Sequence, residues 1–305
     1  MRTFLDCIPC FFKQALEAAR MAGASEEGQK EILDKVAGAL PGFSLTLSPP
    51  EMARVIHGIV KKHTGVNDPY AEIKKKSNNL ALSIYGKLKK KLQESRDRLL
   101  TAAELAIAGN ILDCGVKNSL NVGKELKKIL AEEKRAIGAE DNRFFNYPQF
   151  KNALDKAKNV LYLADNAGET LFDRVFIEEI KIRDSSKNII YAVKEKPAIN
   201  DALAADAYFC GIDKSAQIAS SGSDVPATIL SRCSKDFLKR FKKADLIISK
   251  GQGNFEALSA VAGPIFFLLM AKCPVIAGEI GCKVGDVILL SYNQTLEMSK
   301  GENNV

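Results

Sequence analysis

A short apolar run that ends abruptly on polar residues constrains the fold of this chain more than any other feature. The run Val160–Leu163 is β-prone, and Asp165 and Asn166 follow it, before a small-residue turn and the amphipathic stretch Leu171–Phe176. This order predicts a buried parallel strand, a turn at its carboxyl end and a helix directly behind the turn. In open α/β sheets that edge binds ligands. A helix N-terminus there favours an anion, because its first N–H groups lack partners.

Short apolar runs alternate with helical patterns throughout the second half of the chain. This alternation predicts an α/β fold, a Rossmann-like three-layer αβα domain whose sheet is largely parallel and doubly wound. The expected strands are Val160–Ala164, Ile189–Val193, Gln217–Ala219, Leu246–Ser249, Ile265–Leu269 and Val287–Leu290.

The first 145 residues show helical periodicity almost throughout, which predicts an all-helical N-terminal portion. We place the boundary in the polar link 141–148. Residues 1–145 are then a helical bundle that covers the cleft, and residues 146–305 are the α/β part that binds metal and phosphate. The expected helices are Phe4–Met21, Ser25–Ala39, one that begins at Ser48–Glu51, Asp68–Lys91 and Leu99–Ile111.

The composition argues against several classes of protein. The chain has 305 residues, is 46% hydrophobic and 27% charged, and carries a net charge of +7, which is ordinary for a globular protein. Its densest basic run, Lys87–Lys91, lacks the arginine and aromatic residues of a nucleic-acid groove, so we expect no nucleic-acid partner. The longest apolar stretch, Ile265–Ala277, is interrupted by Lys272 and Pro274, so we expect no membrane association.

The cysteines and the first residues bear on the cellular compartment. Seven cysteines are scattered along the chain without the spacing of a disulfide framework. Asp6 and Pro9 interrupt the apolar core that an export signal would need. We therefore expect a cytoplasmic protein. Cys7 and Cys10 could form half of a metal site or a redox pair, but buried helix packing is the favoured explanation.

Four polar clusters follow expected strands or lie beside them, so they would converge on one cleft. The first cluster offers two carboxylates and an amide oxygen, which suit Mg²⁺, Mn²⁺ or a similar cation better than structural zinc. The only two histidines, His57 and His63, lie in the helical part, which nearly excludes a histidine-based metal site. The clusters are Asp165–Glu169, Lys196–Asp201, Ser220–Asp224 and Ser249–Glu256.

Three of these clusters also have a simpler explanation. Asp165 and Asn166 could be a helix cap and a turn residue, and Asp201 could cap the following helix. Lys250 could be a point charge for one phosphate or part of a surface turn, because its glycine-rich loop lacks the third glycine of a dinucleotide site. Glu169 could simply be an acid stabilised by the helix dipole.

The ordered set of motifs resembles the domain-of-unknown-function 89 family, the damage-control phosphatases. The similarity extends from Cys7 to about Leu290, and the C-x-x-C motif resembles the compact prokaryote- and archaeon-type subfamily. The motifs of the second half are D-N-A-G-E at 165–169, N-D at 200–201, G-S-D-x-P at 222–226, S-K-G-Q-G-N-F-E at 249–256 and A-K-C-P-V-I-A at 271–277. Those of the first half are C-I-P-C at 7–10, D-P-Y at 68–70 and A-G-N-I-L-D at 108–113.

The resemblance implies a metal-dependent phosphatase that hydrolyses phosphomonoesters of small metabolites, such as sugar phosphates or damaged phosphometabolites. Its metal triad would fall on Asp165, Asn166 and Asp201, and the divalent ion would be Mg, Mn, Co or Ni. Lys250 would contact the phosphate. Asn110 and Asp113 would line the cleft from the helical part.

From these assignments we form a hypothesis of catalysis. Lys250 and the backbone N–H groups of residues 167–169 would hold the phosphate, and Glu169 or Asp113 would orient the attacking water. Two alternatives stay open: an S-adenosylmethionine-dependent carboxyl methyltransferase, for which the glycine pattern is poor, and a non-catalytic metal- or metabolite-binding module. Substrate contacts are expected from Asn110, Gly168, Asp224, Lys250, Gly251 and Asn254.

Overall fold

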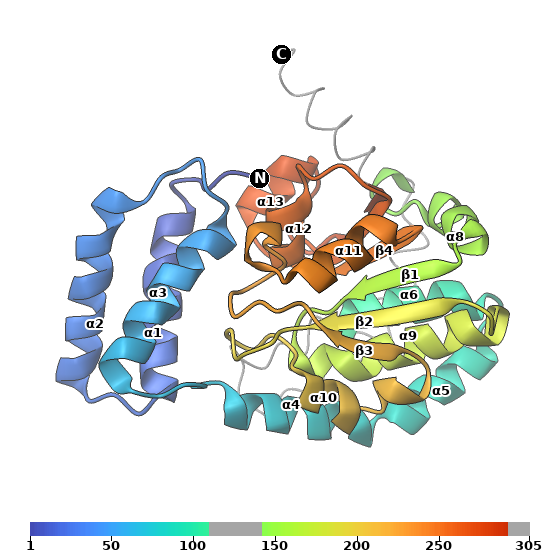
Figure 1. Cartoon of the computed structure of the whole chain (residues 1–305), viewed down its shortest axis with the longest axis horizontal. Coiled ribbons are helices and arrows are strands. Elements are labelled where there is room, and N and C mark those ends of the chain that lie inside the picture. Colours follow the sequence, from blue (N-terminus) through green and yellow to red (C-terminus); the bar gives the residue numbers. More distant parts are fainter. Residues whose placement is uncertain (110–141, 292–305) are drawn as a thin grey trace, which may run out of the picture.

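Residues 1–109 and 142–291 are described by a computed structural model, which has the mixed α/β fold expected from the sequence (Figure 1). A six-stranded sheet has the order β3-β2-β1-β4-β5-β6. Each expected strand is present, and its ends lie within one residue of the expected ones. The strands are β1 Asn159–Leu163, β2 Asn188–Val193, β3 Gln217–Ser220, β4 Leu246–Lys250, β5 Ile265–Met270 and β6 Val287–Ser291.

The sheet is parallel except at one edge. β1 pairs in parallel with β2 and β4, and parallel pairing continues outward to β3 and β5, whereas β6 is antiparallel to β5. From β1 the chain moves outward through β2 and β3 and then returns to β4 on the other side of β1. The carboxyl ends of β1 and β4 therefore lie side by side at a switch point, where sheets of this kind bind ligands.

Helices cover both faces of the sheet, which gives three layers (Figure 1). Val160 and Tyr162 of β1 pack with one set of helices and Leu161 and Leu163 with the other, because alternate side chains of a strand point to opposite faces. The first set contains α4 Ala71–Ser83, α5 Tyr85–Glu94, α6 Arg98–Ala108, α8 Tyr147–Lys156, α9 Thr170–Arg183 and α10 Ala204–Phe209. The second contains α11 Lys235–Lys243, α12 Gln252–Leu258 and α13 Pro274–Ile280.

The first three helices pack as a separate cluster beside the sheet (Figure 1). Expected start signals are present: Ser25 accepts a hydrogen bond from the Gly28 N–H, and the Ser48 N–H donates to Glu51. These caps fix where the second and third helices begin. The helices are α1 Cys7–Met21, α2 Glu26–Ala39 and α3 Pro49–Thr64.

Two expectations for the helical part need correction. The stretch Asp68–Lys91, expected as one helix, is divided into α4 and α5 at Ile84, whose buried side chain packs into the core beneath the sheet. The first helix begins at Cys7 rather than at Phe4. Helices α4–α6 share their core with the sheet and not with α1–α3. The boundary at residues 145 and 146 stays a prediction from the sequence.

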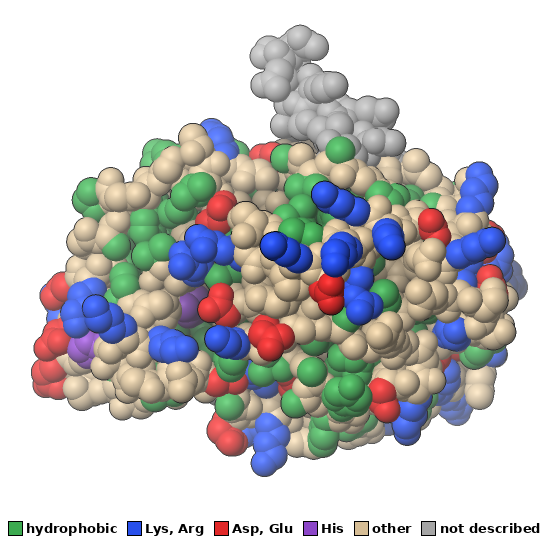
Figure 2. Space-filling view, viewed as in Figure 1, with side chains coloured by type: hydrophobic (Ala, Val, Ile, Leu, Met, Phe, Trp, Pro, Cys, Tyr) green, Lys and Arg blue, Asp and Glu red, His purple; other side chains and the backbone are tan. Residues whose placement is uncertain are grey.

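The surface bears on the expected partners. On the face drawn in Figure 2, basic side chains gather over α11, and acidic and basic side chains are intermixed over the rest of the face. Among the described residues, no helix is both long and apolar enough to cross a membrane. The side chain of Cys10 is exposed and accepts a hydrogen bond from Gln14 Nε2 at 3.3 Å, so buried packing does not explain this cysteine.

Candidate active site

The proposed site lies at the switch point between β1 and β4. Asp165 follows β1 directly, and Gly251 follows β4. Gly251 has a φ of +80°, and a Cβ built on it would lie 1.8 Å from Asp165 Oδ2. Only a residue without a side chain therefore lets the carboxylate rest against the end of β4.

A short antiparallel contact brings the second carboxylate to the same place. Asn166 and Asp201 form an isolated bridge, in which the Ala202 N–H donates to the Asp165 carbonyl at 2.8 Å. The Ala167 N–H donates to the Asn200 carbonyl at 3.0 Å. The backbone thus joins the segment after β1 to the segment that precedes α10, and it gathers Asp165, Asn166 and Asp201.

Burial sets the electrostatics of these three side chains. Asp165 is 9% exposed, Asn166 is 7% exposed and Asp201 is 3% exposed. Burial raises the pKa of Asp165 well above its ordinary value, and the charges of Glu169 and Asp201 raise it further. Burial also raises the pKa of Asp201, against the charge of Lys194. A cation between the two carboxylates would relieve both desolvation and repulsion.

The donor set fits a hard divalent cation. Asn166 Nδ2 donates to Asp165 Oδ2 at 3.1 Å and to Glu169 Oε1 at 2.8 Å, so both amide hydrogens are used and the amide oxygen is the atom suited to a metal. Two carboxylates and an amide oxygen match the preference of Mg²⁺ or Mn²⁺. Within residues 1–109 and 142–291, no group of three or more His, Cys, Asp or Glu side chains could hold a metal. The proposed site differs from such groups because one of its three ligands is the amide of Asn166.

Two strained backbone positions flank Asp201. Ile199 has a φ of 44° and Ala227 a φ of 58°, and no other non-glycine residue in the described ranges has a positive φ. The Ala227 N–H donates to Asp201 Oδ2 at 3.1 Å. Lys194 Nζ donates to the Ala227 carbonyl and lies 3.4 Å from Asp201 Oδ2. Strain of this kind gathers at sites whose geometry the fold must impose.

Lys250 was expected in a loop but lies at the end of a buried strand. It is the last residue of β4, and its side chain is completely buried. Its Nζ donates to Glu169 Oε2 at 3.1 Å and to Asp173 Oδ1 at 2.8 Å. Burial alone would lower the pKa of Lys250, but the charges of Asp173 and Glu169 outweigh it and hold this pKa above its ordinary value.

Asp173 belongs to this network and was not expected from the sequence. It accepts hydrogen bonds from Tyr162 OH at 2.6 Å and from Tyr191 OH at 2.8 Å, and it has no exposed surface. The available signal was its spacing, because Asp173 follows Glu169 by four residues and therefore shares its helix face. The other residues of that face are apolar, which indicates that the face is buried rather than exposed to solvent.

Other residues expected at the site have definite positions. Gly168 lies against α4, where a Cβ would be 2.8 Å from Ser77 Cβ. Asn254 Nδ2 donates to the carbonyls of Ala164 at 3.0 Å and Lys250 at 2.8 Å, and its buried Oδ1 has no hydrogen-bond partner among the described residues. Asn110 and Asp113 lie outside the described residues.

Two of the backbone N–H groups expected to hold a phosphate are already bonded. The Ala167 N–H donates to Asn200, as described above, and the Glu169 N–H donates to the Asn166 carbonyl at 3.1 Å. Both oxygens of the Glu169 side chain also accept hydrogen bonds, from Asn166 and Lys250. These two N–H groups are therefore engaged within the protein rather than free to bind a phosphate.

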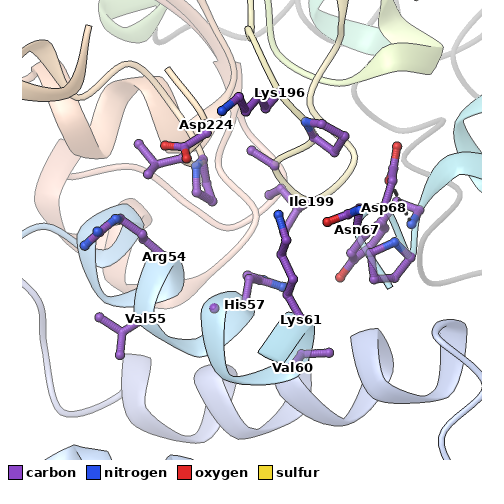
Figure 3. A pocket seen from close by; sticks show the side chains of 17 residues that line it. Arg54, Val55, His57, Val60, Lys61, Asn67, Asp68, Lys196, Ile199 and Asp224 are labelled. Carbon is purple, nitrogen blue, oxygen red and sulfur yellow. Dashed lines mark hydrogen bonds between the residues drawn. The ribbon is translucent and has the colours of Figure 1, made fainter. Parts of the chain in front are cut away.

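A cavity of about 430 Å³ lies between α3 and the loops that follow β2 and β3 (Figure 3). Its wall residue Ala198 accepts a hydrogen bond from the Asp201 N–H at 3.0 Å, so the cavity lies next to Asp201. Asp224 lines this cavity and is not among the residues that hold Asp165. Asp165 borders a narrow space of about 10 Å³. The cavity wall includes Arg54, His57, Lys61, Lys196, Ile199 and Asp224.

Comparison with known proteins decides the family. Residues 3–288 match the family described as the damage-control phosphatase ARMT1-like domain. The chain belongs to this family. It is 32% identical to a damage-control phosphatase of Pyrococcus horikoshii, over 95% of this chain and 98% of that protein. It is also 32% identical to a damage-control phosphatase of Archaeoglobus fulgidus, over 92% of this chain and 96% of that protein.

A solved structure agrees with this assignment. The crystal structure of a DUF89 family protein from Pyrococcus horikoshii has a TM-score of 0.84 and 31% identity to this chain, and covers 96% of this chain and 99% of its own. A protein of Methanocaldococcus jannaschii, described as uncharacterized, is 36% identical over 93% of this chain and 94% of its own length. The family expected from the motifs, the fold class and the phosphatase class are thus confirmed for this chain.

Proposed function

We propose that this protein hydrolyses phosphomonoesters of small metabolites in a reaction that requires a divalent metal ion. The observation that carries the proposal is the meeting of Asp165, Asn166 and Asp201 at the switch point of the sheet, where two buried carboxylates repel each other. The relatives named damage-control phosphatases support the same reaction.

The reaction transfers a phosphoryl group to water. A water oxygen forms a bond to phosphorus while the bond from phosphorus to the bridging oxygen breaks, and the products are an alcohol and inorganic phosphate. Asp165, Asn166 and Asp201 would hold the divalent ion, whether Mg, Mn, Co or Ni, through oxygen atoms. When bound, such an ion polarises a phosphoryl oxygen and lowers the pKa of a coordinated water.

We assign the neighbouring charged residues two roles. The ammonium group of Lys250 has three hydrogens, of which Glu169 and Asp173 take two, so one can serve a phosphate oxygen. Glu169 is a positioning residue in this assignment, because Asn166 and Lys250 occupy both of its oxygens. We also place the protein in the cytoplasm, since the six cysteines of the described residues are free thiols.

Hydrolysis of p-nitrophenyl phosphate by metal-stripped protein tests the proposal. We expect activity to return when Mg²⁺, Mn²⁺, Co²⁺ or Ni²⁺ is added singly, and Asp165→Ala to abolish it. Asp236→Ala is the matched control, because Asp236 is exposed on α11 and only its contact with Lys239 at 3.5 Å is lost. Metal-dependent activity that survives in Asp165→Ala would refute the assignment of the triad.

A further inference from the structure

The cavity beside α3 carries positive charge that the proposed chemistry does not use. Arg54 and Lys61 of α3 and Lys196 of the loop after β2 line it from two sides (Figure 3). Lys61 extends from α3 toward Ile199, across the space between helix and loop (Figure 3). In residues 1–109 and 142–291, no side chain forms an ion pair or hydrogen bond with any of these three cations.

The acidic residues of the cavity balance only part of this charge. Asp68 is paired with Lys74, with 2.6 Å between Oδ2 and Nζ, so the two together add no net charge. Asp224 is the remaining acid on the wall. His57 adds no positive charge at neutral pH, because burial lowers its pKa to about 4. Three unpaired cations thus face one unpaired acid, and a bound anion would relieve their mutual repulsion.

The cavity adjoins the proposed metal triad. Ile199 on its wall precedes Asp201 by two residues, and Pro226 precedes Ala227, whose N–H donates to Asp201 Oδ2. The volume of about 430 Å³ falls within the usual range of small-molecule sites. A metabolite with its phosphate at the triad would extend its far end between α3 and Lys196.

We propose that this cavity selects phosphorylated metabolites that carry a second anionic group, a carboxylate or another phosphate, at the end remote from the reacting phosphate. The inference rests on the proposed hydrolysis at the triad. Arg54, Lys61 and Lys196 bind the second anion, and Asp224 accepts hydrogen bonds from hydroxyl groups between the two ends.

A matched pair of ligands tests this selection. Glucose 6-phosphate and 6-phosphogluconate share the same phosphate, and only the second carries a carboxylate at its far end. Dissociation constants from calorimetry in the presence of Mn²⁺, and kcat/KM where hydrolysis occurs, give a preference ratio for the pair. We expect the full-length protein to prefer 6-phosphogluconate. Lys61→Gln and Lys196→Gln should each lower the ratio about threefold to tenfold, as for a partly exposed charged contact.

Lys62→Gln is the matched control, because Lys62 is the next residue of α3, is exposed and does not line the cavity. It should keep the ratio of the unmodified protein. The inference is overturned if the protein binds both ligands equally, or if Lys62→Gln lowers the ratio as much as Lys61→Gln. Glucose 1,6-bisphosphate in place of 6-phosphogluconate shows whether a phosphate serves as well as a carboxylate.

The failure of this inference can be told from the failure of the proposed function. Hydrolysis of p-nitrophenyl phosphate without any preference between the two sugar ligands would refute the anion subsite alone. Charge-dependent binding of 6-phosphogluconate with no hydrolysis of any phosphomonoester would refute the proposed function and leave the subsite in place.

Discussion

At the scale of single residues, the proposed site depends on glycines, whose lack of a side chain lets other groups approach closely. Gly251 leaves room for the Asp165 carboxylate, and Gly168 leaves room for Ser77 of α4. Ile199 and Ala227 take backbone conformations that side chains disfavour, and the second of them donates to Asp201. The proposed metal triad is therefore held by close approach of the backbone rather than by long side chains.

Substitution of Gly251 by alanine tests this close approach. The added Cβ would meet Asp165 Oδ2 at 1.8 Å, so the carboxylate has to move. We expect kcat/KM for p-nitrophenyl phosphate to fall by about 100-fold, the size of loss that a displacement of about 1 Å can cause. Gly23→Ala is the control, because Gly23 has a similar φ of +75° and open space around it. It should lose about 1–2 kcal/mol of stability and keep its activity.

Equal activity in the two alanine variants would show that the position of Asp165 is not set by Gly251. A loss in both variants would trace the effect to backbone strain alone.

At the scale of secondary-structure elements, one buried charge network ties α9 to three strands. Asp173 of α9 contacts Tyr162 of β1, Tyr191 of β2 and Lys250 of β4. Glu169, at the start of the same helix, joins Lys250 to Asn166. The network lies directly beneath the triad, so it fixes the helix whose N-terminal turn forms part of the site.

We expect Asp173→Asn to lower the free energy of unfolding by about 3–5 kcal/mol, because it removes one of the two negative charges that compensate a fully buried ammonium group. Urea unfolding at pH 7 measures the change. Asp236→Asn, on the surface of α11, should stay within about 0.5 kcal/mol. A loss below about 1 kcal/mol in Asp173→Asn would mean that Glu169 alone compensates Lys250.

The strands could be predicted from the sequence more reliably than the contacts that individual side chains make. The six strands could be predicted because each is a short apolar run between helical patterns, and the convergence of Asp165, Asn166 and Asp201 followed from the edge at which parallel strands end. Lys250 and Asp173 could not be placed, because their partners are tertiary: Lys250 meets an acid 77 residues away in the sequence. The cavity was missed for the same reason, since α3 approaches the loops only in the folded chain.

At the scale of the whole molecule, two packing units meet at the cavity. Helices α1–α3 have a core of their own, and the sheet with its helices has two more, one on each face. His57 of α3 lies at the junction, where its ring packs edge-on against Tyr70 with 6.1 Å between the ring centroids. Its Nε2 is buried and has no hydrogen-bond partner within residues 1–109 and 142–291.

We expect His57 to make the fold sensitive to acid. Burial lowers its pKa from 6.5 to about 4, so the unfolded chain binds a proton in a pH range where the folded chain does not. This contribution to stability is complete above pH 6.5 and is lost as the pH falls toward 4, by up to about 3 kcal/mol. Urea unfolding between pH 4.5 and 7.5 should show this loss, and His57→Gln should lack it.

His63→Gln is the control, because His63 is the other histidine of the chain and lies on the same helix. It should retain the acid sensitivity of the unmodified protein. The same pH dependence in His57→Gln and the unmodified protein would assign the acid sensitivity to other groups.

The position of the cavity has an evolutionary consequence. Asp165, Asn166 and Asp201 are enclosed by backbone contacts, so almost any substitution near them disturbs the fold as well as the chemistry. Arg54, Lys61 and Lys196 stand on exposed positions, where replacement costs little stability. If the cavity selects the substrate as proposed, mutation can change which metabolite is accepted without altering the proposed hydrolytic centre, and a lineage can acquire new substrates in single, tolerated steps while it inherits one reaction.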